Sequence, residues 1–146
     1  MPDIENTLSL SIQYKAVELL SAKLSMPEAP PVADQKYNFT INLEHKFIKD
    51  QKIIFVLVNI IINLEGCEQS SGEVLISNAF FIENYEEVVI EENGEPKGIQ
   101  VAAADIFNSV SISTARGVLS QQFRGTWLHT AVLPVINPRD LTVVGK

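Results

Sequence analysis

The sequence predicts an α+β fold in which one long helix packs on one face of a four-stranded antiparallel sheet. Two observations favour this class. Four segments of alternating apolar and polar residues come first, and a stretch long enough for about seven helical turns follows them. At 146 residues the chain is most simply one domain, so we expect a single unit over 1–146.

The first two strands are predicted from their period of two. Every second residue is apolar at the start of 8–24, and the pattern slips between Val17 and Leu20, where we expect a bulge. Residues 37–48 alternate most strictly. The proline-rich segment 26–36 between them cannot form a helix or a central strand, so we expect it to cross over other elements.

The next two strands are predicted over 53–65 and 73–82, separated by a turn at 66–72. An acidic segment and a turn at 93–98 then lead into the long helix. After the helix come two prolines and short apolar runs, so a second helix, after Pro138, would be short.

The predicted helix over 99–124 has almost no charged side. Between Lys97 and Arg124 its only charged residues are Asp105 and Arg116, whereas a surface helix usually shows one charged face. Gly125 is suited to the left-handed conformation that ends helices. We infer that one helix face packs on the sheet and another meets a second subunit; the alternative is the core helix of a monomer.

Composition excludes several classes of function. The net charge of −7 argues against general nucleic-acid binding, and no apolar run is long enough to span a bilayer. The N-terminus lacks the positive region of a secretory signal, and a single cysteine suits a reducing compartment. We therefore expect a cytoplasmic protein with no nucleic-acid partner and no membrane insertion.

Residues that could carry chemistry are few and scattered. His45 lies on the apolar side of a predicted strand, and His129 has no metal-ligand spacing around it. Cys67 lacks a CxxC partner, and the glutamates of 83–95 are typical of a solvated surface. No phosphate-binding loop is present. The sequence predicts no catalytic residue, metal site or cofactor, and no enzyme, although an enzyme with His45 or the glutamates in a deep pocket is an open alternative.

Three stretches in order resemble the SecB family of export chaperones. LSMPEAPPV at 24–32 is similar to the family's crossover between the first two strands, and NAFFI at 78–82 is similar to its fourth strand. The third stretch combines Ala115-Arg116 in the helix, RGTW at 124–127 and LPVIN at 133–137. The resemblance implies a SecB-like sheet and helix, dimers formed by paired subunits, and a tetramer in which dimers meet through the long helices.

The resemblance also implies an ATP-independent chaperone that binds unfolded polypeptides and keeps preproteins competent for the Sec translocase. The alternative within the family is a chaperone dedicated to one client, such as the antitoxin of a toxin–antitoxin system. A subunit whose apolar surface is consumed by oligomerisation is a third hypothesis.

Residues are assigned to these roles by the resemblance. The client groove would contain Met26, Pro27, Pro30, Val32, Phe39, Phe81, Trp127, Leu133, Val135, Ile136 and Leu141. The oligomer interface would contain Ile106, Ser109, Val110, Ser113 and Arg116.

Docking to the SecA ATPase is a separate question. Ser21 and Ser25 stand where export-type members carry acidic residues that contact SecA, and Glu73 is the candidate for the family's other acidic contact. The resemblance therefore leaves SecA binding open.

Overall fold

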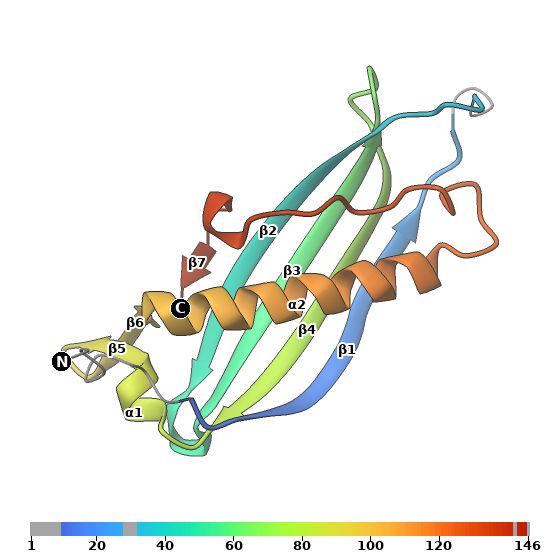
Figure 1. Ribbon diagram of the computed structural model, residues 1–146. Coiled ribbons are helices and arrows are strands. Elements are labelled where there is room, and N and C mark those ends of the chain that lie inside the picture. The colour runs from blue at the N-terminus through green and yellow to red at the C-terminus, as the bar shows by residue number, and fades with distance from the viewer. Residues whose placement is uncertain (1–9, 28–31, 142, 146) are drawn as a thin grey trace, which may run out of the picture.

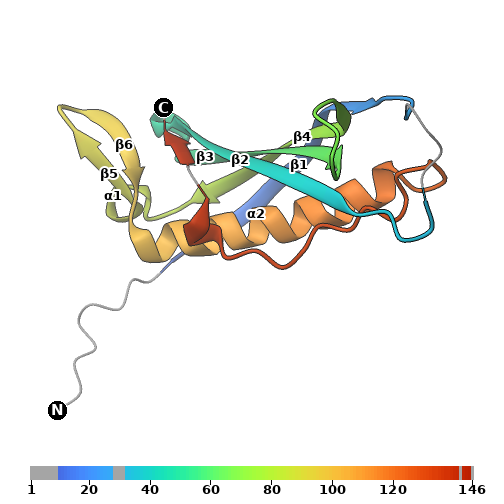
Figure 2. The same ribbon diagram turned by 90° about the horizontal axis from the view of Figure 1, so that it is seen from above.

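A computed structural model describes residues 10–27, 32–141 and 143–145. A five-stranded sheet of order β1-β4-β3-β2-β7 carries one long helix on one face, and a two-stranded hairpin lies at one end of the sheet (Figures 1 and 2). The four long strands are antiparallel, which confirms the predicted fold class. They are β1 (Ile12–Leu24), β2 (Tyr37–Ile48), β3 (Ile53–Leu64) and β4 (Ser70–Ile82).

Two strand boundaries differ from the prediction. β4 begins at Ser70, not at residue 73, because Ser70 pairs with Asn63 and Gly72 pairs with Leu24 and Ile62. The predicted turn at 66–72 is correspondingly shorter. β1 begins at Ile12, and residues 8 and 9 of the predicted first strand lie outside the described residues.

β1 contains two register shifts, one between Tyr14 and Ala16 and one between Leu19 and Ser21. The second confirms the predicted slip near Leu20, whereas the first was not expected. A bulge moves the residues beyond it to the other face of the sheet. As a result Ala16 pairs with Ala79 and lies on the opposite face from Tyr14, which pairs with Phe80.

The acidic segment is more ordered than the sequence suggested. It forms α1 (Tyr85–Val88), β5 (Val89–Glu92) and β6 (Glu95–Ile99). The hairpin turns at Asn93 and Gly94, both with positive φ, as a tight two-residue turn requires. Because Ile99 ends β6, the prediction of a helix from residue 99 was wrong at its start.

The long helix α2 (Val101–Gln122) packs on the sheet through one face. Phe107 is fully buried, and its ring lies 5.0 Å from that of Phe80 on β4. Gly125 has φ 80° and lies just beyond the helix end, as predicted. Among the described residues, no helix is both long and apolar enough to cross a bilayer. The helix side of the sheet is formed by alternate, fully buried residues: Ile54, Val56, Val58, Ile60, Ile62, Val74, Ile76 and Ile82.

Residues 123–137, here called the return loop, run back from α2 over the same face of the sheet (Figures 1 and 2). The loop lies directly on β4, where a Cβ at Gly72 would be only 2.6 Å from Leu128 Cδ1. It ends in η2 (Pro138–Asp140), the short helix expected after Pro138, and in β7 (Val143–Gly145). β7 is an unpredicted fifth strand, parallel to β2.

Candidate functional site

The outer edge of β2 is only partly paired. On one side β2 pairs with β3 from Tyr37 to Ile48, whereas on the other side β7 pairs only with Leu43, Glu44 and His45. Within the described part of the chain, the outer edge over residues 37–42 therefore has no strand partner. The unpaired N–H and C=O groups of such an edge can pair with an added extended strand.

A mostly apolar cavity of about 330 Å³ opens beside this unpaired edge. It lies between β2, the return loop and Leu141. It brings together three residues that were assigned to the client groove, Phe39, Ile136 and Leu141. The complete lining is Tyr37, Asn38, Phe39, Ile41, Pro134, Ile136 and Leu141.

A second cavity, of about 360 Å³, contains two other predicted groove residues. Met26 and Pro27 face the β3–β4 turn there, and most of the other lining residues are polar. Phe39 does not line this cavity. The structure therefore divides the predicted groove between two places on the surface.

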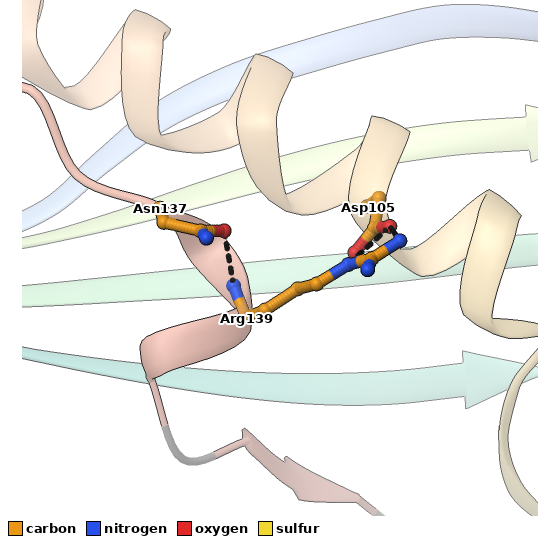
Figure 3. Close-up of polar contacts among 3 residues, drawn as sticks. All are labelled: Asp105, Asn137 and Arg139. Carbon is orange, nitrogen blue, oxygen red and sulfur yellow. Dashed lines mark hydrogen bonds and ion pairs between the residues drawn. The ribbon is translucent and has the colours of Figure 1, made fainter.

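Arginine side chains fix the return loop and the segment after it to α2. Arg116 donates to Leu133 O at 3.1 Å and to Pro134 O at 2.9 Å. Arg139 reaches Asp105 with two hydrogen bonds of 2.6 and 2.9 Å, and Asn137 Oδ1 accepts from the Arg139 backbone N–H (Figure 3). Arg116 was assigned to the oligomer interface, but its guanidinium is used within the chain.

The return loop also contacts the segment that crosses between β1 and β2. Trp127 Nε1 donates to Ser25 O at 3.0 Å, and Tyr37 Oη is 2.8 Å from Thr130 Oγ1. Trp127 thus joins the two segments that were expected to form the groove. Its indole is half-buried, so it supports the groove wall more than it presents a free surface.

The other predicted groove residues separate into exposed and buried positions. Val135 is 96 % exposed, Met26 87 % and Val32 65 %, so these side chains are available to a partner. Leu133 is buried in the core, where it caps the sheet instead of lining the groove. Pro30 lies outside the described residues.

Phe81 does not belong to this surface. Its neighbour Phe80 contacts Phe107 on the helix, and successive side chains of a strand point to opposite faces. Phe81 therefore lies on the face without the helix, away from Phe39. Assigning Phe81 to the same client groove as Phe39 was incorrect because the sequence pattern did not show which face the helix covers.

The face of α2 that points away from the sheet is uncharged and exposed. Ile106 is 46 % exposed and Val110 37 %, and Ser109 and Ser113 are exposed beside them. Four of the five residues assigned to an oligomer interface thus share one accessible helix face. In Figure 1 the side of α2 that points away from the sheet is toward the viewer. That another subunit covers this side is a prediction.

Glu73 lies on the sheet face without the helix. Its carboxylate accepts a hydrogen bond from Asn59 Nδ2 at 3.1 Å, and its neighbour across the pair of strands is Lys23 on β1. Ser21 lies on the same face, opposite Leu75. The candidate SecA contact is therefore a single acidic residue set between an amide and a lysine.

His45 is buried between the sheet and α2, and its Nε2 is 2.8 Å from Asn108 Oδ1. It lines neither of the two cavities described above. Burial lowers the pKa of His45 below its usual value, and the hydrogen bond to Asn108 opposes this in part. Among the described residues, no three His, Cys, Asp or Glu side chains are grouped so that they could hold a metal ion.

Acidification is expected to destabilise the protein through His45. Because its pKa is lower in the folded state, the unfolded chain takes up a proton first as the pH falls below about 6.5, the ordinary value for histidine. The stability that the fold gains from keeping His45 neutral is complete above that pH and is lost as the pH falls below it. Urea unfolding at pH 7.5 and 5.5, at one protein concentration, measures the loss. His45→Gln should reduce the loss of stability between the two pH values. His129→Gln, the control at an exposed histidine, should show the same loss as the wild type. An equal loss in the two variants would contradict the role of His45.

Sequence reasoning missed part of the cavity. Tyr37 and Ile41 share the alternation of Phe39, and that signal would have found them. Pro134 and the Asp105–Arg139 ion pair gave no such signal, because they depend on where the return loop lies.

The fold is that of the SecB-like chaperones. The chain aligns with a SecB-like chaperone of Mycobacterium tuberculosis, Rv1957, whose structure was solved in complex with a ChAD peptide from the Rv1956 HigA1 antitoxin. The alignment covers 86 % of this chain and 89 % of that chain, with a TM-score of 0.62 and 11 % sequence identity. No protein-family model and no curated protein sequence matches the chain.

Proposed function

We propose that this protein is an ATP-independent chaperone that holds unfolded polypeptides in the cytoplasm. The observation that carries the proposal is the combination of an unpaired β2 edge over residues 37–42 with the apolar cavity beside it. A backbone edge recognises any extended chain, and an apolar cavity favours apolar side chains without requiring a sequence. Together they suit non-native clients.

The exposed apolar side chains of the neighbouring loops support this reading. Met26, Val32 and Val135 are largely exposed, and the hydrogen bond between Trp127 and Ser25 keeps their two segments together. Exposed apolar side chains on two segments that are held together in this way suit the binding of another polypeptide. The excess of acidic residues would favour basic clients.

The proposal is tested by the aggregation of a heat-unfolded model enzyme, followed by light scattering without nucleotide. We expect the wild-type protein to suppress aggregation at stoichiometric amounts, and Ile136→Asp to lose most of that protection because it places a charge in the cavity. Ile90→Asp is the matched control, since Ile90 is exposed on the β5–β6 hairpin. No suppression by the wild-type protein would contradict the holdase function, and full protection by Ile136→Asp would place client binding elsewhere.

A single dedicated client is the second candidate. The structural neighbour Rv1957 was solved with an antitoxin peptide, and this favours an antitoxin client here as well. Affinity capture separates the two functions: a set of unrelated preproteins supports export, and one small partner supports an antitoxin. If preproteins are the clients, delivery to SecA is tested by titrating a peptide from the SecA C-terminus against the wild-type protein and Glu73→Gln.

We also propose that the subunits assemble as a dimer of dimers. The support is the uncharged, exposed face of α2 around Ser109 and Ser113, which a second helix could cover. A surface helix that stays in water usually carries charge on that side.

A further inference from the structure

The last strand, β7, differs from the rest of the sheet. It pairs with β2 in parallel through Leu43↔Val143, Glu44↔Val144 and His45↔Gly145, whereas the four long strands pair antiparallel over most of their length. Parallel pairing is slightly weaker per residue, and so short a strand forms few hydrogen bonds. β7 is therefore the least firmly held strand on β2.

The segment leading to β7 is held by solvent-exposed contacts. The Arg139–Asp105 ion pair has side-chain exposures of 66 % and 31 %, and pairs this accessible to water contribute little to stability. The bond from Arg139 N–H to Asn137 Oδ1 is local, since it joins residues two apart. The apolar contact of this segment is Leu141, which is partly buried against the core and lines the cavity. Elements with few buried contacts are those that open first in native proteins.

β7 and the unpaired edge share one line of backbone. Residues 37–42 are open on the outer side of β2, and Leu43–His45, which β7 covers, continue directly from them. The chain itself thus shows that this edge accepts a strand. A polypeptide that paired along 37–42 would meet β7 if it continued for one more residue.

We propose that β7 is an internal competitor for the client edge, and that an extended client displaces it to pair along the whole of 37–45. The inference rests on the proposed client-binding function and adds a regulatory element to it. The occupant is a client segment in extended conformation, free of proline and with apolar side chains at alternate positions, so that one of them enters the cavity beside Phe39 and Ile136. In the absence of a client, β7 shortens an edge that would otherwise invite aggregation.

The test uses the full chain with Val143→Pro and Val144→Pro together. Proline lacks the N–H donor, so the pair of substitutions prevents β7 from pairing whichever of the two amides faces β2. The probe is a fluorescein-labelled peptide of alternating valine and threonine with a lysine at each end, measured by fluorescence anisotropy. While β7 occupies the edge, only the molecules in which β7 has detached can bind the peptide, so the apparent affinity is reduced by that fraction. We therefore expect the variant, in which the edge is always open, to bind about tenfold more tightly than the wild type. The same peptide with proline at alternate positions should show no such gain.

Arg139→Gln provides a second route that leaves β7 itself unchanged. It removes the exposed ion pair to Asp105 and should strengthen peptide binding only about twofold, less than the two prolines do, whereas Arg124→Gln, at an exposed arginine just after α2, should not. Unchanged or weaker binding in both the proline variant and Arg139→Gln, with wild-type binding intact, would overturn the competition by β7 and leave the chaperone function standing. No binding by any of these proteins would overturn both.

Discussion

Phe107→Ala is expected to lower the free energy of unfolding by about 3–5 kcal/mol, the usual cost of truncating a fully buried phenylalanine. Phe107 is completely buried between α2 and the sheet, and its ring lies 5.0 Å from Phe80, which in turn stacks on Tyr14 at 4.6 Å. The substitution removes the middle of the contact between the helix and two strands. Urea denaturation followed by circular dichroism measures the change.

A stability of about 5–15 kcal/mol is typical of a native domain, so this one substitution would consume a large part of it. Val135→Ala is the control, since Val135 is 96 % exposed and its truncation should change stability by less than about 0.5 kcal/mol. A loss below about 1 kcal/mol for Phe107→Ala would mean that the helix does not pack on β4 as described.

Ser109→Glu combined with Ser113→Glu is expected to convert a tetramer into dimers. Both serines lie on the exposed, uncharged face of α2, and a helix-to-helix contact related by a two-fold axis would bring the new carboxylates of both partners together without water. Multi-angle light scattering should give four times the 16.2 kDa chain mass for the wild type and twice that mass for the variant.

Gln122→Glu is the matched control for these serine substitutions. It adds one negative charge, against two in the double serine variant, at an exposed position in the last turn of α2 on a different side of the helix, and should leave the wild-type mass unchanged. If the double serine variant kept the tetramer, the face around Ser109 would not be the contact between dimers. A wild-type protein with the mass of one chain would contradict the assembly itself.

The strands of the sheet were largely predictable because each long strand has one face in the core. The alternation from Tyr37 to Phe47 and from Ile54 to Ile62 reflects the burial of every second side chain. With only Asp105 and Arg116 charged, the segment 101–122 indicated a helix with two apolar sides, and the structure confirms the one that packs on the sheet. Local pattern was sufficient in these cases because burial follows the period of the element.

The acidic hairpin and the early start of β4 were not predictable in the same way. Glutamates dominate 83–95, and composition of this kind is typical of a solvated loop. The segment nevertheless folds because Tyr85, Val88 and Ile99 anchor it in the core. Three apolar residues distributed over α1 and β6 make no recognisable period along the chain.

By itself, the sequence determined the α+β class, the four antiparallel strands, the long helix and the left-handed Gly125 beyond its end, since each depends on residues close together in the chain. The helix itself ends at Gln122, two residues before the predicted end. Only the tertiary structure decided which face of the sheet the helix covers, and so separated Phe81 from Phe39. Only the tertiary structure showed the open edge of β2, the cavity beside that edge and the ion pair between Asp105 and Arg139. These features join segments that are distant in sequence, and their contacts follow from the path of the return loop over the sheet.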